Sequence, residues 1–381
     1  MTPHYYIGIM SGTSLDGIDV ALVDIQDQTV TLVAASETPF EAELRSQLLV
    51  LCQEPTVHLE QLGTLSVKLS LAYAQAANQL LDTAQLRPSD IQAIGCHGQT
   101  IYHQPEGAWP FSMQLINSSV LASHCHITTV TDFRSMDIAL GGQGAPLVPP
   151  FHQQLCGHLI AENPSLVLLN IGGIANVSIL KPTPLRGFDT GPGNVLMDSF
   201  LQQQNGLLFD DAGRIAASGS VNHSLLARFL SDEYFAITGP KSTGREYFNL
   251  DWLNTLLAQF DTQPISDVLA TLSVFVAQTI ARALHSLPPG LLLVCGGGAK
   301  NTHLFNNLAQ ALPLWRIDTT NKHGIDADSM EAMAFAWLAK QCLERKTGNA
   351  PDVTGAHQAE ILGQITQVYS HQPTSIGKET R

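Results

Sequence analysis

The stretch IGIMSGTSLDGIDVALVDI, residues 7–25, places a small polar segment between two apolar runs. Ile7 and Ile9 before this segment, and Ile18 and Val20 after it, alternate with other residues as strand residues do. The bend itself, SGTSLDG, is rich in glycine and hydroxyl residues, whose backbone N–H groups can surround an anion closely. The stretch therefore predicts a β-hairpin with a phosphate at its turn, although the same residue types also form ordinary hairpin turns.

Two later stretches repeat parts of this design. The segment SLVLLNIGGIANVSIL, residues 165–180, has an apolar run, a turn of Gly172, Gly173 and Asn176, and a second apolar run. We interpret it as a second hairpin and as the sign of a duplication at the scale of a domain. The segment GLLLVCGGGAKNTHLFNNLAQAL, residues 290–312, predicts a buried strand, a triple glycine and a helix, an arrangement that commonly faces a nucleotide.

Glycine and proline mark one strong break in the chain, DFRSMDIALGGQGAPLVPPF at residues 132–151. The length of 381 residues also favours two domains. We therefore predict a first domain over residues 1–135 and a second over residues 136–345. The C-terminal segment, residues 346–381, is expected to pack back on the first domain and to be mobile beyond about residue 370.

Two helices are predicted from apolar residues. The first covers residues 62–80, where these residues recur at steps of three and four, and Pro88 is expected to end it. The second is GIDADSMEAMAFAWLAKQCLERK, residues 324–346, which we expect to be amphipathic and to close the second domain.

The composition argues against several classes of protein. A total of 19 Lys and Arg against 33 Asp and Glu gives a formal net charge of −14, which argues against a broad nucleic-acid surface. The six cysteines lie without a CxxC pair, so we expect free thiols in a reducing compartment. We find no signal-peptide pattern at the N-terminus and no uninterrupted apolar stretch elsewhere that is long enough to cross a bilayer. A cytoplasmic protein without membrane or nucleic-acid partners is therefore predicted.

Six motifs occur in an order typical of one family. They are GIMSGTSLDGID, GCHGQT, GGQGAPL, NIGGIAN, FDTGPGN and DADSMEAMAFAWLA. In this order they resemble the motifs of the anhydro-N-acetylmuramic acid kinase family, and the resemblance extends from Ile7 to about Gly363. At a coarser level, the two hairpins and the strand with its triple glycine resemble the superfamily of actin, heat-shock chaperone ATPases and sugar kinases. The resemblance implies an α/β, two-domain, actin-like ATPase (ribonuclease H-like) fold with a nucleotide cleft between the domains.

The family resemblance also implies a reaction. Members of the family are expected to use ATP and Mg²⁺ to phosphorylate O6 of 1,6-anhydro-N-acetylmuramic acid while water opens the anhydro bridge. The product would be N-acetylmuramic acid 6-phosphate, an intermediate of peptidoglycan recycling. A homodimer is implied in the same way.

The ATP site is implied by the same motifs. Its residues would be Gly12, Thr13, Ser14, Leu15, Asp16, Gly17, Ile18 and Asp19 from the first hairpin, and Gly172, Gly173, Asn176, Gly296, Gly297 and Gly298 from the later turns. Gly12, Thr13 and Ser14 would offer N–H and hydroxyl donors to the phosphates. Asp16 would orient Mg²⁺ through water molecules bound to the ion. A P-loop is a poor alternative because the chain contains no GxxxxGK[ST] sequence.

Four residues are implied to contact the sugar, namely His97, Arg134, Asp189 and Glu331. In the family motif Asp189 is the general base that activates water for attack on the anomeric carbon, and Glu331 is a second contact of that water. Structural alternatives stand beside these roles. His97 can satisfy a neighbouring carbonyl, and Asp189 can cap its own turn. Arg134 can pair with Asp137 as readily as with the lactyl carboxylate of a muramic acid.

Other functions stay open from the sequence. A plain sugar kinase of the same superfamily would phosphorylate a hydroxyl without opening a ring. A chaperone or filament ATPase normally needs added peptide-binding or assembly segments, and we recognise none after the closing helix. The segment GPKSTGREYF, residues 239–248, is left outside the predicted site because it fits a helix-capping loop equally well.

Overall fold

The computed structural model describes residues 3–12, 15–27, 29–53, 56–237 and 241–368. The chain divides into two compact units, each built from segments that are distant in the sequence. The first unit consists of Met1–Gly144, Glu331–Asn349 and Ala356–Arg381, and the second of Ala145–Met330 and Ala350–Gly355. The tail that we predicted to be mobile beyond about residue 370 lies outside the described residues.

The limits of these units differ from the predicted domains. The first unit continues to Gly144 rather than ending at residue 135. The segment Glu331–Asn349, most of which we expected in the second domain, belongs to the first unit. Within the predicted C-terminal segment, Ala350–Gly355 belongs to the second unit.

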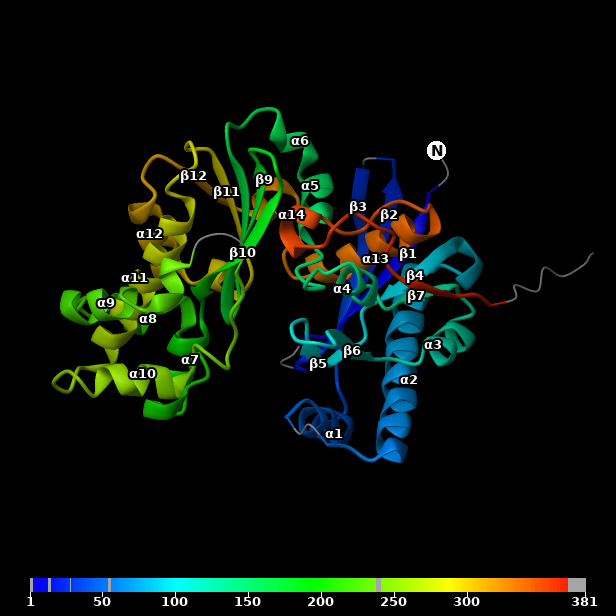
Figure 1. The fold of residues 1–381 in the computed structure, drawn as a ribbon, viewed down its shortest axis with the longest axis horizontal. Helices are drawn as coiled ribbons and strands as arrows, with labels where there is room; N and C mark the ends of the chain where they lie inside the picture. The colour runs from blue at the N-terminus through cyan, green and yellow to red at the C-terminus, as the bar shows by residue number, and fades with distance from the viewer. Residues whose placement is uncertain (1–2, 13–14, 28, 54–55, 238–240, 369–381) are drawn as a thin grey trace, which may run out of the picture. The chain divides into compact units, whose positions relative to one another are not determined.

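The first unit is built on a six-stranded sheet (Figure 1). Its strands are β1 (Tyr5–Met10), β2 (Gly17–Gln26), β3 (Thr29–Pro39), β4 (Ile91–Cys96), β7 (Thr129–Thr131) and β13 (Gln364–Thr366). Strands β1, β2 and β3 form an antiparallel meander, and β4 and β7 continue the sheet parallel to β1. The order is β13-β7-β4-β1-β2-β3, so the hairpin predicted over residues 7–25 is confirmed.

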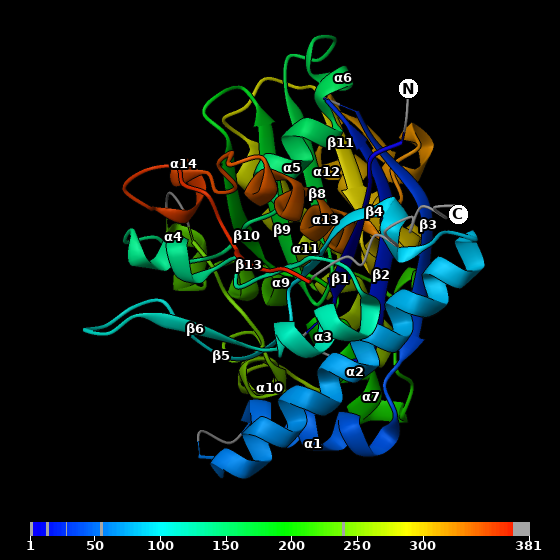
Figure 2. The ribbon, with the colours of Figure 1, turned by 90° about the vertical axis from the view of Figure 1, so that its right-hand side faces the viewer.

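Helices and a separate hairpin complete the first unit. They are α1 (Ala42–Gln53), α2 (Leu59–Ala84), η1 (Pro88–Asp90), the strand pair β5 (Gln99–Gln104) and β6 (Phe111–Leu115), α3 (Ser118–Cys125), α4 (Ser135–Ala139) and α13 (Met330–Leu343). Figure 2 shows the β5–β6 hairpin extending from the rest of the unit. The helix predicted over residues 62–80 is confirmed as α2, which buries Leu65, Leu69 and Leu80. The helix ends at Ala84, before Pro88. Gln85, the residue after Ala84, adopts a left-handed backbone conformation.

The closing helix α13 is enclosed, so the prediction that it is amphipathic is wrong. Every residue from Ala332 to Lys340 is buried. The helix lies directly on the first sheet, where a Cβ atom on Gly8 of β1 would come within 1.7 Å of the carbonyl oxygen of Ala332. A Cβ on Gly95 of β4 would come within 2.0 Å of the carbonyl oxygen of Phe335. Two glycines on neighbouring strands thus let the helix backbone approach the sheet, which places α13 in the first unit.

The second unit repeats the architecture of the first sheet (Figure 1). Its strands are β8 (Leu166–Ile171), β9 (Ile174–Lys181), β10 (Arg186–Pro192), β11 (Leu291–Cys295) and β12 (Arg316–Thr319), in the order β10-β9-β8-β11-β12. As in the first sheet, three strands form an antiparallel meander and two more run parallel to the first of them. This is the strand order of a ribonuclease H-like fold, so the predicted α/β fold class and the domain-scale duplication are confirmed.

The remaining elements of the second unit surround this sheet. They are α5 (Pro149–Leu155), α6 (Gly157–Ile160), α7 (Val195–Asn205), η2 (Asp211–Gly213), α8 (Arg214–Ala217), α9 (His223–Leu230), η3 (Glu233–Ala236), α10 (Leu250–Leu257), α11 (Ile265–Leu284), η4 (Gly297–Lys300), α12 (Thr302–Ala311), η5 (Thr320–His323) and α14 (Pro351–Thr354). The strand, triple glycine and helix predicted over residues 290–312 are confirmed as β11, η4 and α12.

Two expectations drawn from the composition can be compared with the structure. No disulfide joins the six cysteines, as predicted, and all of them lie in the described part of the chain. One described helix, α11, is long and apolar enough to cross a membrane by length and composition, but Asp267 and Arg282 interrupt its apolar sequence. Leu272, Phe275 and Ile280 of α11 are nevertheless fully buried in the core of the second unit, so α11 serves as a core helix there.

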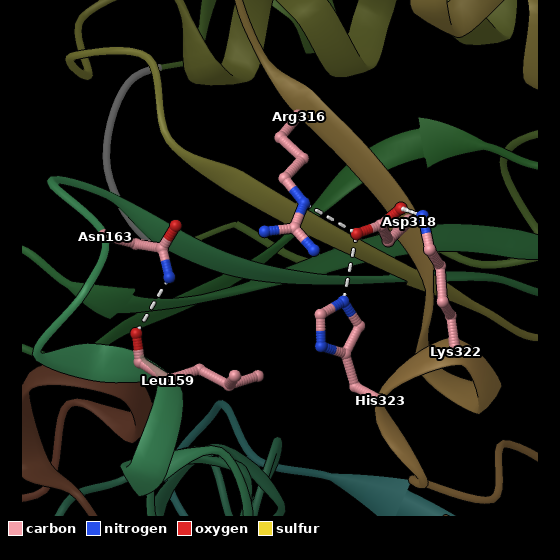
Figure 3. Close-up of polar contacts among 6 residues, drawn as sticks. All are labelled: Leu159, Asn163, Arg316, Asp318, Lys322 and His323. Atoms are coloured by element: carbon pink, nitrogen blue, oxygen red, sulfur yellow. Dashed lines mark hydrogen bonds and ion pairs between the residues drawn. The ribbon is translucent and has the colours of Figure 1, made fainter.

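A cluster of charges around Asp318 holds the edge strand β12 to the turn η5 (Figure 3). The Asp318 carboxylate is only 5% exposed and accepts hydrogen bonds from Arg316 Nε at 2.9 Å, Lys322 Nζ at 2.5 Å and His323 Nε2 at 3.0 Å. Burial alone would raise the pKa of this carboxyl. The hydrogen bonds from Lys322 and His323 and the charges of Arg316 and Lys322 instead lower the pKa to about 2.

We expect Asp318→Asn to lower the free energy of unfolding of the second unit by about 1–3 kcal/mol at pH 7, because it weakens a buried, charge-assisted cluster. Since the pKa is about 2 in the fold and about 3.9 in an unfolded chain, the stabilisation is present above pH 4 and is lost as the pH falls toward 2. Denaturant unfolding at pH 7 and pH 3 measures both effects. The control is Asp211→Asn, which removes the exposed pair with Arg214 and is expected to cost less than about 1 kcal/mol. Equal losses in the two variants would contradict the prediction.

Candidate active site

The turn of the first hairpin is held by backbone and side-chain contacts within the first unit. Leu15 has a φ of 54° and a fully buried side chain, and its N–H donates to the carbonyl oxygen of Gly12 at 3.1 Å. The Arg45 guanidinium donates from Nε to the carbonyl oxygen of Leu15 at 2.8 Å. Of the predicted phosphate donors, Thr13 and Ser14 lie outside the described residues. The buried side chain of Leu15 thus anchors the described end of the turn in the core of the first unit.

A buried polar network holds Ser11 and Gly12 at the start of the same turn. The hydroxyl of Ser11 lies 2.6 Å from the hydroxyl of Tyr73 on α2 and donates to Oε1 of Gln99 at 2.8 Å. The amide of Gln99 donates in turn to the carbonyl oxygen of Gly12 at 3.3 Å. Gln99 belongs to the GCHGQT motif, and no feature of the sequence connects it with the turn. Tyr73 was missed as well, although a buried tyrosine hydroxyl requires a polar partner.

We expect Gln99→Leu to raise the KM for ATP about tenfold while changing the KM for the sugar little. The substitution leaves the Ser11 hydroxyl and the Gly12 carbonyl without the amide partner that holds them, which loosens the turn. Steady-state kinetics with each substrate varied in turn measure the two constants. The control is Gln114→Leu, which removes contacts to Thr100 and Ser112 on the neighbouring hairpin. The same rise in both KM values, or a rise in neither, would show that Gln99 does not serve the turn.

The other predicted residues of the first hairpin lie on its second arm. Asp16 is exposed, and its carboxylate lies 3.8 Å from Arg45 Nη2. Gly17, Ile18 and Asp19 lie in β2, where the Ile18 side chain is buried in the core. Ile18 could therefore offer a nucleotide only its backbone. Among the described residues no three His, Cys, Asp or Glu side chains gather as a metal cage would require.

In the second unit the two glycine turns lie side by side. Strands β8 and β11 are parallel neighbours, with Asn170 paired to Cys295, so the turns at their carboxyl ends meet. Gly296 has a φ of 78°, and a Cβ on it would come within 2.3 Å of Asn170 Oδ1. Gly172 and Gly297 have more room, because the nearest atoms to their Cβ positions lie at 3.5 and 3.6 Å. Gly172 and Gly296 are 124 positions apart in the sequence (296 − 172), and the sheet brings their turns together.

The turn at Gly172 and Gly173 is also hydrogen-bonded to the start of α7. The N–H groups of Gly193 and Val195 donate to the carbonyl oxygen of Gly173 at 2.8 and 3.1 Å, and that of Asn194 donates to the Gly172 carbonyl at 2.8 Å. Asn176 is not part of this turn, because it lies within β9. Its prediction as a turn residue is therefore wrong, and the strand pairing places it directly opposite Asp189 of β10.

Asp189 is fixed by the segment that we had left outside the site. Its carboxylate Oδ2 accepts the N–H of Thr243 at 2.9 Å, and its own N–H donates to the carbonyl oxygen of Lys241 at 3.0 Å. The hydroxyl of Tyr234 donates to the Asp189 carbonyl at 2.7 Å. Burial raises the pKa of Asp189 to about 6; the Thr243 hydrogen bond opposes this, and the charge of Glu246 adds to it. The carboxylate thus binds a distant backbone N–H instead of capping its own turn.

The same segment contributes Arg245, which the sequence reasoning missed. Its Nη2 and Nε atoms lie 3.5 and 3.6 Å from the position that a Cβ on Gly173 would occupy, so the guanidinium covers the turn at Gly172 and Gly173. Burial raises the pKa of Asp198 on α7 to about 6, and the charge of Arg245 opposes that rise. An arginine beside a glycine turn is a suitable ligand for a phosphate. The only signal in the sequence was the proximity of Arg245 to Lys241 and Ser242.

In the first unit, Arg134 and His97 form a direct pair. Nε and Nη2 of Arg134 donate to Nε2 of His97 at 3.0 and 2.8 Å, and Nη1 donates to the carbonyl oxygen of Gly144 at 2.6 Å. Since Nε2 of His97 accepts, the ring is neutral with its proton on Nδ1. Nδ1 is buried, and the backbone of the neighbouring Gly98 acts on the ring electrostatically, so the alternative that His97 satisfies a nearby carbonyl stands beside its contact with Arg134. Burial, followed by the charge of Arg134, lowers the pKa of His97 well below its ordinary value, and a hydrogen bond with the Gly98 backbone opposes this.

Asp137 stabilises this pair indirectly. Its carboxylate accepts the N–H of Gly144 at 2.8 Å and Nδ2 of Asn349 at 2.7 Å. Asp137 thus fixes the Gly144 carbonyl that Arg134 binds. Arg134 and Asp137 are thus connected through the backbone of Gly144, in the GGQGAPL motif, and this connection replaces the alternative of a direct pair. Burial lowers the pKa of Arg134 to about 10, and the charges of Glu331 and Asp137 oppose this.

Glu331 lies in the first turn of α13 and is exposed to solvent. Desolvation raises the pKa of its carboxyl, and the charge of Arg134 opposes this rise. The charge of Arg134 thus acts on both Glu331 and His97 within the first unit. Asp189 and the glycine turns at 172–173 and 296–298 belong to the second unit.

Among solved structures, component A of (R)-2-hydroxyglutaryl-CoA dehydratase from Acidaminococcus fermentans matches with a TM-score of 0.45 at 12% identity, covering 87% of this chain and 96% of that one. A ROK family glucokinase from Streptomyces griseus, in complex with glucose and AMPPNP, matches with a TM-score of 0.40 at 12% identity, covering 88% and 99%. These likenesses are weak, and the fold assignment rests on the strand order of the two sheets.

The sequence matches are much stronger. Proteins named anhydro-N-acetylmuramic acid kinase are 47% identical in Photobacterium profundum, over 94% of this chain and 98% of the relative. The relative from Vibrio cholerae is 48% identical over 94% of this chain and 97% of its own length. The relative from Pasteurella multocida is 47% identical over 95% of this chain and 96% of its own length. The family model described as anhydro-N-acetylmuramic acid kinase matches residues 4–368. The chain therefore belongs to the anhydro-N-acetylmuramic acid kinase family.

Proposed function

We propose that this chain is a cytoplasmic, ATP-dependent kinase that converts 1,6-anhydro-N-acetylmuramic acid and water to N-acetylmuramic acid 6-phosphate, a step of peptidoglycan recycling. Family membership supports the class of substrate and reaction. The observation that carries the proposal is the carboxylate of Asp189, which is fixed by the Thr243 N–H and has a pKa of about 6. A positioned carboxylate of this kind suits a general base.

Asp189 would accept the proton that the attacking water loses. In the proposed step the water oxygen bonds to the anomeric carbon while the bond from that carbon to O6 breaks. O6 bonds to the γ-phosphorus as the bond from that phosphorus to the departing ADP oxygen breaks. With a pKa of about 6, roughly nine-tenths of the Asp189 carboxyls are ionised at pH 7 and can take the proton. Asn176, opposite Asp189 on β9, would help to orient the water or the sugar.

Arg134 would bind the lactyl carboxylate of the sugar. A guanidinium has five N–H donors, and three of them are used by His97 and Gly144, which leaves two for a ligand. The bonds to His97 and Gly144 hold the planar group in one orientation, so little side-chain entropy is lost when the carboxylate binds. Glu331 would contact the attacking water, as the family motif implies.

ATP would bind at the glycine turns. The room beside Gly172 and Gly297 lets a phosphate approach the backbone, and the Arg245 guanidinium supplies a positive charge beside Gly173. In the first unit, Gly12 would offer its N–H to a phosphate. The exposed carboxylate of Asp16 fits an ion held through water, and Mg²⁺ bound there would neutralise phosphate charge. A homodimer is also proposed from the family resemblance.

We expect kcat/KM to fall about tenfold for each pH unit below about pH 6. Asp189 must be ionised to accept a proton, and its raised pKa of about 6 means that it is protonated as the pH falls through that value. A pH–rate profile from pH 5 to pH 8 at saturating Mg²⁺ and ATP tests this. The profile of Asp189→Asn, followed through its residual activity, should lack the step. A wild-type profile that is flat between pH 7 and pH 5 would contradict Asp189 as the base.

A coupled assay of ADP release tests the proposed substrate. The anhydro sugar is compared with glucose, N-acetylglucosamine and N-acetylmuramic acid at equal concentrations. The proposal predicts turnover with the anhydro sugar and little with the others. Turnover with glucose but not with the anhydro sugar would instead indicate a plain sugar kinase.

A further inference from the structure

We propose that a pocket in the second unit binds a small organic anion that carries both a carboxylate or phosphate group and an apolar part. The pocket has a volume of about 400 Å³, which lies in the range of small-molecule sites. It is formed by the edge strand β10, the end of α11 and the segments around η3 and α14. This site goes beyond the proposed function, because neither ATP nor the sugar is assigned to it.

The pocket lies along the edge strand β10, beside the segment that fixes Asp189. A Cβ on Gly191 would meet Phe235 and Thr279 of the pocket, and the pairing of β10 shifts between Asp189 and Gly191. Arg186 and Phe188 of β10 line the pocket, and Thr279 and Arg282 of α11 add to the wall. Asp189 is not among the described residues that line the pocket, so the proposed base is not part of this site.

The charges around the pocket favour an anion. Arg186, Lys241 and Arg282 line it, against the single carboxylate of Asp352. These are three of only 19 Lys and Arg residues in a chain of net charge −14, so the positive charge is concentrated at this point.

Two of these side chains are held in place by the protein. Lys241 Nζ donates to the carbonyl oxygen of Tyr234 at 3.1 Å and lies 4.3 Å from the centre of its ring. Nη1 of Arg282 donates to the carbonyl oxygen of Leu230 at 3.2 Å. Fixed cationic groups lose less entropy when they bind a ligand than free ones do.

Much of the remaining wall is apolar, which distinguishes the expected ligand from inorganic phosphate. Phe188 and Phe235 line the pocket together with Pro184 and Ile237. Ile237 is 50% exposed, so a ligand that covered it would remove apolar surface from water. A molecule with an anionic group at one end and a ring at the other satisfies both parts of the wall. A polynucleotide or a protein segment would not enter a cavity of this size.

Isothermal titration calorimetry with phenyl phosphate tests the proposal. The full chain is titrated in the presence of saturating ADP and Mg²⁺, so that the nucleotide site is already filled. We expect saturable binding with a dissociation constant of about 1 mM, as is usual for a ligand of this size. Inorganic phosphate and benzyl alcohol each supply half of the ligand and should bind at least about tenfold more weakly.

Variants locate the binding. Arg186→Gln and Arg282→Gln should each weaken phenyl phosphate binding about tenfold or more, because each removes a charged partner. The control is Arg228→Gln, an exposed arginine of α9 that bonds to Gln259 and Ser231 outside the pocket, and it should bind like the wild type. Thermal unfolding checks that each variant is folded. The proposal is overturned if the wild type shows no saturable binding up to about 10 mM, or if Arg186→Gln and Arg282→Gln bind as tightly as Arg228→Gln.

Discussion

Asp189→Asn will lower the rate of product formation about 100- to 10,000-fold, the usual contribution of a positioned general base. Asparagine keeps an oxygen that can accept the Thr243 N–H, so the side chain should stay in place while losing its ability to take a proton. Phosphorylation and ring opening should fail together, because O6 becomes the phosphate acceptor only as the anhydro bridge opens. Single-turnover measurement of ADP and sugar phosphate, with enzyme in excess, reports the chemical step directly.

The matched control for this variant is Asp267→Asn. Asp267 lies in the same unit and also accepts one backbone N–H, that of Ser220 at 2.8 Å, but it belongs to the first turn of α11 and not to β10. This variant should turn over at close to the wild-type rate. If Asp189→Asn kept activity within about tenfold of the wild type, another residue would be the base and Asp189 would be a structural residue.

Arg245→Gln will lower kcat about 100-fold or more, the second largest effect expected. The guanidinium covers Gly173, where it would neutralise charge that develops on the phosphates during transfer. Because this charge is greatest in the transition state, kcat should fall more than the KM for ATP rises. Steady-state kinetics with ATP varied at saturating sugar separate the two constants.

Two further variants test the role of Arg245. Arg245→Lys keeps the charge without the planar fork and should recover part of the lost activity. Arg228→Gln, in the same unit, should leave kcat unchanged. A rise in KM alone would mean that Arg245 binds ATP equally in the ground and transition states, and an unchanged kcat/KM would remove it from the site.

The fold could be predicted well where the signals are local. The alternation of Ile7, Ile9, Ile18 and Val20 located the first hairpin, and the same pattern located the second. The environment of α13 could not be predicted in this way. Its enclosure depends on Gly8 and Gly95, two glycines far away in the sequence whose missing side chains admit the helix. Such a contact leaves no periodic pattern in the helix itself.

The site was predicted in its residue types but not in its contacts. The GCHGQT and FDTGPGN motifs drew attention to His97 and Asp189, yet their partners lie far along the chain. Thr243, which binds the Asp189 carboxylate, follows it by 54 residues, and Tyr73, which supports Ser11, follows it by 62. Only the fold brings such residues together, so Arg245 and Gln99 received no role from the sequence.

The most direct test of the proposed reaction is isotope incorporation from ¹⁸O-labelled water. The anhydro sugar, ATP and Mg²⁺ are incubated with the full chain, and the product is analysed by mass spectrometry within minutes, before exchange at the anomeric carbon. Our account predicts one ¹⁸O atom in each molecule of N-acetylmuramic acid 6-phosphate, at the anomeric carbon, and one ADP for each product. A phosphorylated sugar that retains the anhydro bridge and carries no ¹⁸O would contradict it.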